Sequence, residues 1–364
     1  MLQTIGGTAT CIFLANIEYF RQRACYPYFP MKLATFRSAN ETQGAVLIGE
    51  TLLPLGQIYA AYEASKGRSH DAAELAANYG HGVLGFVQNA ERARKAADWA
   101  VAAHQAGTLA GVKGVALGSV QLLAPIPKPP AMRDGYAFRQ HVVTARRNRG
   151  LEMIPEFDEF PVFYFTNHNA VVGPGELGVK TKHLDKLDFE LEAAIVTGKS
   201  GEDWDIAAAD DAIFGLTVMN DWSARTLQME EMKLSLGPAK GKDFATGIGP
   251  VLVTIDELEP YVTHTPRGRV FNLSMKAWVN GIQVSDGNVN QMNWTFAQIL
   301  ERISYGVRVE IGEVLGSGTV GTGCFLELNG SKITNNQWLQ PGDKVDLEIE
   351  HLGRLSNTIK NKDA

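Results

Sequence analysis

The stretch Asp188–Val196, which reads DFELEAAIV, sets two carboxylates inside a segment that is otherwise apolar. Side chains alternate between the two faces of a β-strand, so Glu190 and Glu192 point to the same side and the apolar residues around them to the other. Two like charges buried side by side raise the free energy of the folded chain unless a cation lies between them. The segment therefore predicts a strand with one face against a hydrophobic core and the other at a charged site.

A cluster of proline residues marks a boundary about one third of the way along the chain. Before it, two short strands within 32–49 are followed by an alanine-rich helical pattern at about 69–106. The stretch 123–130, LAPIPKPP, cannot form a helix or a central strand because four of its residues are proline, so it is typical of a linker. We therefore expect a small N-terminal domain at 31–118 and a larger domain at 119–364.

Short apolar segments with the character of strands dominate the chain beyond the prolines. The turn-forming pairs Asn280-Gly281 and Asp286-Gly287 separate some of them, and CFLELNG at 324–330 is one of the predicted strands. Helical patterns are few and do not alternate regularly with the strands. This excludes a Rossmann fold and predicts an α+β, mainly β architecture.

The first 30 residues contain a short apolar core with no basic region before it and no clear cleavage site, which makes them a poor secretory signal. The sequence that starts at Met31, MKLATFRSAN, is typical of the start of a protein. We therefore predict that translation begins at Met31 and that residues 1–30 are a non-native or disordered extension. N-terminal sequencing of natively expressed protein tests this, because a mature terminus well before Met31 would contradict it.

Charge and cysteine content limit the classes of partner. The net charge is −6 and no basic run stands out, which argues against nucleic acid as a partner. No stretch approaches the roughly 20 apolar residues of a membrane span. Three cysteines make neither a disulfide framework nor a thiolate metal site, which favours a reducing compartment. A cytoplasmic protein without a membrane partner is predicted.

Two further acidic residues could join the pair formed by Glu190 and Glu192. Asp221 ends an apolar run, and Asp134 precedes His141 by seven residues. Four carboxylates without a thiolate select a hard cation, Mg²⁺ or Ca²⁺ with Mn²⁺ also possible, and a divalent ion would remove the repulsion between the glutamates. Ordinary alternatives stay open, namely an arginine ion pair or a solvated edge strand for the glutamates, a helix N-cap for Asp221, a turn for Asp134 and an exposed helix for His141.

Five stretches of the chain form a recognisable set: DFELEAAIVTGK, IFGLTVMNDWSARTLQ, GPAKGKDF, SGTVGTGCFLEL and PGDKVDLEIEHLGRLSN. Together they resemble the fumarylacetoacetate hydrolase family, in the order of that family and over roughly residues 120–360. The stretch RDGYAFRQH at 133–141 is similar to the fumarylacetoacetase members of the family. The resemblance implies a mixed β-sandwich or roll around a metal site, usually in a homodimer.

The resemblance also implies roles for individual residues. It implies a divalent cation held by Asp134, Glu190, Glu192 and Asp221, with Lys242 and Thr246 close to the ion. It pairs His141 with Glu327 as a dyad that activates water, and gives Lys242 the task of stabilising an oxyanion. The residues implied to contact substrate are Tyr136, Arg149, Tyr164, Arg225, Gln228 and Thr319. Each of these residues also has an ordinary alternative as a surface, core, turn or ion-pairing residue.

The family reaction is hydrolysis of a carbon–carbon bond in a β-diketone acid. The substrate that the resemblance implies first is fumarylacetoacetate, cleaved to fumarate and acetoacetate in tyrosine and phenylalanine catabolism and aromatic compound degradation. Met232 stands where the fumarylacetoacetase motif has a tyrosine, so the far end of the substrate is expected to be held differently. Acylpyruvate or fumarylpyruvate hydrolysis, oxaloacetate decarboxylation and a non-enzymatic, metal-stabilised scaffold stay open as alternatives.

Overall fold

The computed structural model describes residues 30–364 except 40, 72–74, 76–77 and 80–81. The predicted extension 1–30 therefore lies outside the described residues, apart from its last residue, and the predicted start at Met31 stays a prediction. None of the helices in the described ranges is long and apolar enough to cross a membrane.

A large mixed sheet runs through the molecule. Its twelve strands in the described part of the chain are β1 (Lys32–Ser38), β2 (Glu41–Ile48), β3 (Thr51–Pro54), β4 (Val115–Ala116), β5 (Gln121–Leu122), β6 (Met132–Gly135), β7 (Phe163–Phe165), β8 (Val171–Val172), β11 (Leu191–Thr197), β12 (Ile213–Asp221), β14 (Thr246–Thr254) and β19 (Val314–Gly316). The hydrogen-bonded order is β4-β3-β2-β1-β14-β12-β11-β19-β6-β7, with β5 beside β1 and β8 beside β14. The strand pairs β19–β6 and β14–β8 are parallel, so the sheet is mixed as predicted.

A second sheet of five strands packs against the first. Its strands are β9 (Gly175–Val179), β17 (Ser274–Val279), β18 (Ile282–Asn288), β20 (Lys344–Ile349) and β21 (Gly353–Asn361), in the order β18-β17-β20-β21-β9. Asn280 and Gly281 join β17 to β18 with positive φ angles of 52° and 79°, which confirms the predicted hairpin. Two short ladders complete the strands: β10 (Leu187–Asp188) with β13 (Ser223–Ala224), and β15 (Val262–Thr265) with β16 (Gly268–Phe271).

Hydrophobic cores lie on both faces of the large sheet. On β11, Leu191 and Ile195 belong to the core shared with the five-stranded sheet, as the sequence alternation predicted. Ala194 and Val196, on the other face, belong to the core that is shared with the N-terminal helices. Both faces of β11 are therefore covered, and the charged site lies where the strand begins.

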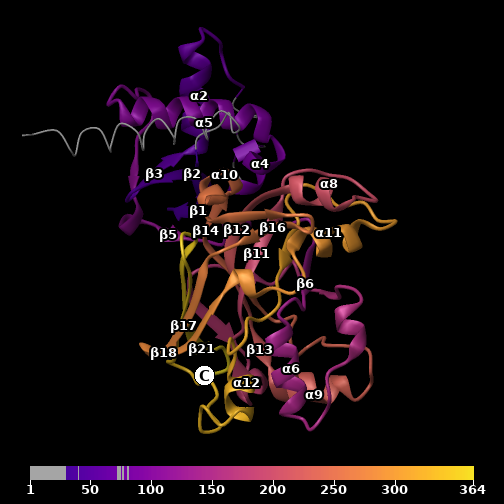
Figure 1. The fold of residues 1–364 in the computed structure, drawn as a ribbon. Helices are drawn as coiled ribbons and strands as arrows, with labels where there is room; N and C mark the ends of the chain where they lie inside the picture. The colour runs from indigo at the N-terminus through magenta and orange to yellow at the C-terminus, as the bar shows by residue number, and fades with distance from the viewer. Residues whose placement is uncertain (1–29, 40, 72–74, 76–77, 80–81) are drawn as a thin grey trace, which may run out of the picture.

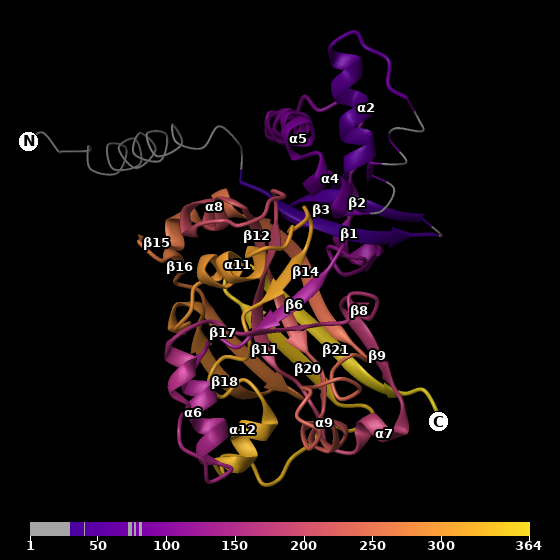
Figure 2. The same cartoon turned by 90° about the vertical axis from the view of Figure 1, so that its right-hand side faces the viewer.

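Helices gather at two opposite ends of the molecule (Figures 1 and 2). At one end α2 (Leu55–Ser65), α4 (Val83–Gln88) and α5 (Ala90–Gln105) cover the N-terminal strands. At the other end lie α6 (Arg139–Arg147), α7 (Thr181–Leu184), α9 (Arg225–Met232) and α12 (Phe325–Gly330). The remaining α-helices of the described residues are α8 (Ile206–Asp211), α10 (Ile255–Leu258) and α11 (Phe296–Ser304). Single turns of 3-10 helix are found at Leu117–Ser119, Pro155–Asp158, Glu259–Tyr261 and Val289–Gln291.

One predicted strand, and an alternative considered for Asp221, are not found in the structure. CFLELNG at 324–330 was predicted to be a strand but forms helix α12, because a buried carboxylate from another part of the chain binds the first free amides of the helix. Asp221 does not cap a helix, since it ends β12 and α9 starts only at Arg225. The predicted boundary at 118–119 stays a prediction, and β1 pairs with β14 across it.

Candidate active site

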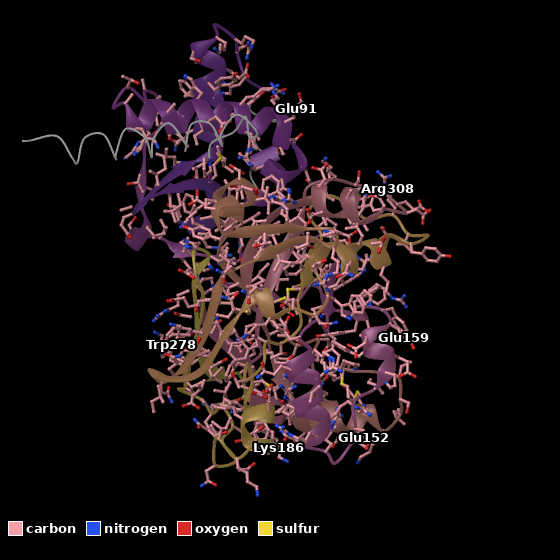
Figure 3. The ribbon with its side chains drawn as sticks, in the orientation of Figure 1. Glu91, Glu152, Glu159, Lys186, Trp278 and Arg308 are labelled. Atoms are coloured by element: carbon pink, nitrogen blue, oxygen red, sulfur yellow. The ribbon has the colours of Figure 1, made fainter. Side chains whose placement is uncertain are left out.

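A large cavity opens at the end of the molecule that carries α6, α9 and α12 (Figure 2). Its volume is about 1090 Å³, enough for a small organic acid and its surrounding water. Lys186 is one of its lining residues and is labelled at that end of the molecule in Figure 3. The predicted site residues that line the cavity are Asp134, Tyr136, His141, Arg149, Tyr164, Glu190, Glu192, Asp221, Arg225, Gln228, Lys242 and Thr319.

Three carboxylates meet in the wall of this cavity. Asp134 comes from β6, Glu192 from β11 and Asp221 from the end of β12, and one oxygen of each lies within 4.8 Å of the others. We call these three residues the carboxylate cluster. Gly316 faces Asp134 across the β19–β6 ladder, and a Cβ atom there would lie 2.3 Å from Asp134 Oδ1. The glycine therefore leaves the space that the carboxylate occupies.

A backbone amide holds two members of the cluster together. The N–H of Gly318 donates to Asp134 Oδ1 at 3.0 Å and to Glu192 Oε2 at 3.1 Å. Thr319 Oγ1 lies 3.4 Å from Glu192 Oε1, at the long end of the hydrogen-bond range. The loop after β19 thus fixes the orientation of carboxylates that belong to two other strands.

Burial and mutual repulsion disfavour the charged form of the cluster. Burial, and then the charge of Asp221, raise the pKa of Asp134 from 3.8 to about 7. Burial also raises the pKa of Asp221 from 3.8 to about 6, although Lys242 acts in the opposite direction. Burial, and then the charge of Asp134, raise the pKa of Glu192 well above its usual value. Without a cation between them, these groups hold protons close to neutral pH.

Glu190 is neutralised by side chains of the protein itself. Lys242 Nζ lies 2.5 Å from Glu190 Oε2 and 2.5 Å from Asp221 Oδ2, so the lysine bridges Glu190 to the cluster. The guanidinium of Arg225 lies 2.7 Å from Glu190 Oε1. Burial alone would raise the pKa of Glu190, but Lys242 and Arg225 outweigh it and hold the pKa well below its usual value. The arginine ion pair considered from the sequence is therefore present at Glu190.

The cluster suits a hard divalent cation. It offers carboxylate oxygens from three strands and no thiolate, the donor set that Mg²⁺, Ca²⁺ and Mn²⁺ prefer. Asp221 Oδ1 is buried and has no hydrogen-bond partner, and a buried acceptor of this kind is normally satisfied. Both oxygens of Glu190 already bind cationic side chains, so its predicted role as a metal ligand requires Lys242 or Arg225 to move.

The predicted dyad lies beside the cluster. His141 Nδ1 and Glu327 Oε2 are 2.7 Å apart, and both side chains are buried. His141 comes from α6 and lines the cavity, whereas Glu327 comes from α12 and lies behind the imidazole. The contact through Nδ1 leaves Nε2 of His141 as the nitrogen that can exchange a proton with a bound molecule. The exposed-helix alternative for His141 is therefore excluded, since this side chain is 5% exposed.

The predicted substrate-contacting residues take different positions in the cavity. Tyr164 OH donates to Asp221 Oδ2 at 2.6 Å, so it is tied to the cluster. Gln228 Oε1 accepts from Arg225 NH1 at 3.0 Å, one turn along α9. Burial raises the pKa of Tyr136 to about 12, which keeps this hydroxyl protonated. Arg149 is exposed on the rim, where its guanidinium Nε donates to the carbonyl of Ala145.

Like Glu327, Thr246 is a predicted site residue that does not line the cavity. It is buried at the start of β14, where it pairs with Asp221 in the β12–β14 ladder.

Two residues near the site were not predicted. Asp188 is fully buried and bonds to Arg225, and the thiol of Cys324 lies within 4.8 Å of ligand atoms of the dyad. The polar start of DFELEAAIV was a signal for Asp188, whereas nothing in the sequence singled out Cys324.

The sequence of this chain is similar to that of a known protein family and of several known proteins. The family model Fumarylacetoacetate (FAA) hydrolase C-terminal matches residues 131–360. Oxaloacetate tautomerase YisK from Bacillus subtilis (strain 168) is 31% identical over 278 residues, which cover 73% of this chain and 81% of that protein. Fumarylacetoacetase from Arabidopsis thaliana is 35% identical over 196 residues, which cover 44% of this chain and 46% of that protein. The match to the tautomerase is therefore the longer of the two.

Solved structures share the fold. The structure of maleylpyruvate hydrolase from Sphingobium sp. SYK-6 in complex with manganese (II) ion and pyruvate has a TM-score of 0.62 at 18% identity, and the match covers 91% of this chain and 99% of that chain. The expected α+β fold, with mixed sheets and a β-rich catalytic region, is thereby confirmed. The family model, which spans most of the chain, shows that the protein belongs to the fumarylacetoacetate hydrolase family.

Proposed function

We propose that this protein is a metal-dependent hydrolase that cleaves a carbon–carbon bond in a β-diketone acid, with fumarylacetoacetate as the first candidate substrate. The observation that carries the proposal is the buried contact of 2.7 Å between His141 and Glu327 in the wall of a cavity that also holds the carboxylate cluster. A base and a cation site side by side are what hydrolysis of a 1,3-dicarbonyl compound needs.

His141 is proposed to act as the general base. Its Nε2 removes a proton from water, whose oxygen attacks the carbonyl carbon at the bond to be cleaved. Glu327 holds Nδ1–H in place and stabilises the imidazolium that forms. When the carbon–carbon bond breaks, its electron pair remains on the departing fragment as an enolate, which takes up the proton from His141. Water is consumed, and two acids leave.

Asp134, Glu192 and Asp221 are proposed to hold the divalent ion, with Glu190 as a further ligand. A bound Mg²⁺, Ca²⁺ or Mn²⁺ would supply Lewis-acid polarisation of the dicarbonyl oxygens. Lys242, which is positively charged between Glu190 and Asp221, is proposed to stabilise the oxyanion that develops on the attacked carbonyl. Thr246, which pairs with Asp221 in the β12–β14 ladder, is proposed to lie close to the ion although its side chain does not line the cavity.

Positive side chains are proposed to bind the carboxylates of the substrate. Arg225 lines the cavity, and Arg149 lies on its rim, where a flexible guanidinium can close onto a carboxylate as a bidentate partner. Tyr136, Gln228 and Thr319 are proposed to orient the chain between the two ends. Met232 lines the cavity at the place where a tyrosine was expected, so this part of the substrate meets an apolar thioether.

A second candidate is keto–enol tautomerisation of a 2-oxo diacid such as oxaloacetate. The observation that favours it is the match to an oxaloacetate tautomerase over 73% of this chain. The same His141 would then move a proton between the carbon next to the 2-oxo group and the oxygen of that group, through an enolate, instead of activating water. Hydrolysis of acylpyruvates or fumarylpyruvate stays a variant of the first candidate, with the same roles and a shorter or different acyl end.

The test is a panel of substrates given to protein stripped with EDTA and then supplied with Mg²⁺, Ca²⁺ or Mn²⁺. Loss of diketone absorbance would be followed with fumarylacetoacetate, fumarylpyruvate and acetylpyruvate, and enol absorbance with oxaloacetate. Metal-dependent cleavage, fastest with fumarylacetoacetate, would support the first candidate. Rapid loss of enol absorbance without bond cleavage would support the second, and no conversion of any compound by folded, metal-loaded protein would refute both.

We also propose a cytoplasmic homodimer. The edge strand β7 leaves Phe165 75% exposed, and an open strand edge with an apolar side chain can pair with a second copy of the chain. Light scattering coupled to size-exclusion chromatography would give about twice the chain mass of 39.6 kDa for a dimer. Phe165→Glu should then shift the equilibrium towards the monomer, and an unchanged mass in both proteins would contradict this use of β7.

A further inference from the structure

Asp188 binds two parts of the site that lie far apart in the sequence. It ends the short strand β10 and its side chain is 0% exposed. Its Oδ1 accepts a hydrogen bond from the amide of Phe325 at 2.7 Å, and its Oδ2 accepts from the amide of Leu326 at 2.9 Å. These are the first two residues of α12, and Glu327 is the third. The carboxylate therefore satisfies backbone donors that a helix cannot satisfy internally.

The helix has no local substitute for this contact. Cys324, which immediately precedes α12, makes no side-chain capping bond. The helix contains six residues, so few internal hydrogen bonds hold it in place. Asp188 is 137 residues away from Phe325 in the chain, and the contact fixes α12 against the strand region that carries the glutamates. The carboxylate thus ties the start of α12, two residues before Glu327, to β10.

The same carboxylate orients the arginine of the cavity. Arg225 Nε donates to Asp188 Oδ2 at 2.9 Å, and Arg225 NH2 lies 2.7 Å from the same oxygen. NH1 of the guanidinium also donates to Gln228 Oε1 at 3.0 Å, and NH2 donates to Glu190 Oε1 at 2.7 Å. Because the guanidinium is planar and rigid, fixing its Nε edge also fixes the directions of its other N–H groups.

We propose that Asp188 is a positioning residue that sets the place of the dyad and the orientation of Arg225 at the same time. This inference rests on the proposed function, because it gives Glu327 and Arg225 the roles described above. It goes beyond that function because it assigns to one residue, Asp188, the positioning of both the groups that transfer protons and the arginine that binds substrate. A merely structural role for Asp188 would affect stability and leave turnover per folded molecule unchanged.

The test compares Asp188→Asn with a matched control, Asp346→Asn. Asp346 is a similarly buried aspartate, 5% exposed, which accepts a hydrogen bond from Ser356 in the five-stranded sheet and does not line the cavity. Asp188→Asn removes the charge and places an amide group against two backbone donors. Displacing a catalytic group by about 1 Å can cost about 10²-fold, so kcat should fall about 10- to 100-fold and KM should rise. Asp346→Asn should keep the kcat and KM of the wild type, although both variants lose thermal stability.

Two further measurements separate positioning from instability. If Asp188 acts through Glu327, the double variant of Asp188→Asn and Glu327→Gln should have a kcat close to that of Glu327→Gln alone, whereas independent effects would multiply. The NMR signal of the His141 Nδ1 proton, in protein labelled with ¹⁵N-histidine, should move or disappear in Asp188→Asn as it does in Glu327→Gln. This signal does not require turnover, so it decides the inference even if the wild type converts none of the substrates.

The outcomes are distinct. Reduced kcat with an altered His141 signal supports the proposal, and unchanged kcat with an unchanged His141 signal overturns it. If Asp188→Asn does not fold, Asp188→Glu takes its place, because it keeps the charge and moves the carboxylate by one methylene group. This variant should also alter the His141 signal and lower kcat, and wild-type values of both would overturn the proposal. A failure of the wild type in the substrate panel would count against the proposed function and not against this inference.

Discussion

Removal of the metal should make the stability of the protein fall as the pH rises from about 4 to 7. Folding raises the pKa of Asp134 from 3.8 to about 7 and that of Asp221 from 3.8 to about 6, by burial and then by charges within the site. Between the unfolded and folded pKa values, the folded metal-free protein therefore binds more protons than the unfolded chain. Its free energy of unfolding must decrease as pH rises through this window.

The size of the effect follows from the same values. At about 1.4 kcal/mol per pH unit, the change at Asp134 corresponds to about 4 kcal/mol and that at Asp221 to about 3 kcal/mol. The two groups repel each other and share these costs, so we expect a total of about 4–5 kcal/mol over the whole window. Only about 2 kcal/mol of this falls between pH 5.5 and 7, where about 1.5 pH units of the shift of Asp134 and about 0.5 of that of Asp221 remain. At about 2 °C per kcal/mol for a chain of this length, the melting temperature should fall by several degrees. A divalent cation needs the deprotonated ligands, so it should raise the melting temperature more at pH 8 than at pH 5.5.

Differential scanning fluorimetry in EDTA and in excess Mg²⁺, at several pH values from 5.5 to 8, measures both effects. The matched control is Asp134→Asn, which removes one charge from the cluster at nearly constant shape. In EDTA this variant should lose much of the pH dependence, and in Mg²⁺ it should lose most of the metal-induced stabilisation. A metal-induced shift of equal size at pH 5.5 and pH 8 in the wild type would refute the reasoning, as would a metal-free protein that becomes more stable over this range.

Three further predictions concern single residues. His141→Ala should lower kcat by about 10²–10⁴-fold and keep the metal-induced rise in melting temperature, and an unchanged kcat would remove His141 from the mechanism. Gly316→Ala would place a Cβ atom 2.3 Å from Asp134 Oδ1, so the Kd for Mg²⁺ measured by calorimetry should rise at least tenfold; an unchanged Kd would show that Asp134 does not bind the ion. Asp256→Asn breaks a buried ion pair of 2.8 Å with Arg94 that joins α5 to α10, and should cost about 3–5 kcal/mol in urea unfolding without changing KM. A loss below about 1 kcal/mol would contradict that estimate.

The strands and the apolar side of the Glu190–Glu192 segment could be predicted because period-2 alternation is a local signal. The convergence of Asp134 and Asp221 on Glu192 could be inferred only from the family resemblance. It depends on the strand order β12-β11-β19-β6. This order brings Asp221 of β12 towards Asp134 of β6, although these strands do not follow one another in the sequence. Local patterns give the faces of strands, whereas the neighbours of a strand are decided by long-range packing.

The failures have equally specific causes. Asp286-Gly287 was predicted as a turn but lies inside β18, where Gly287 is required because a Cβ atom there would lie 2.6 Å from Val320 Cγ2. The segment 324–330 alternates like a strand, yet it becomes helical against Asp188, a contact over more than a hundred residues. For Glu190 the sequence left open whether an arginine or a metal ion neutralises the carboxylate. The answer depends on where Arg225 lies in the folded chain, which the sequence does not show.

The pairing of β1 with β14 has a consequence for synthesis on the ribosome. Lys32 of β1 pairs with Val253 of β14, and the amide of Met31 bonds to Thr254 Oγ1 at a separation of 223 residues. At about 5–20 residues per second, β1 waits on the order of 10–40 s for this partner to be made. During that time β1 can pair with β2 and, at Phe36 and Arg37, with β5, but Lys32 and Leu33 present an open hydrogen-bonding edge. The nascent chain therefore carries an aggregation-prone edge at the start of β1 until β14 has been translated, and this segment is where a chaperone would act most usefully.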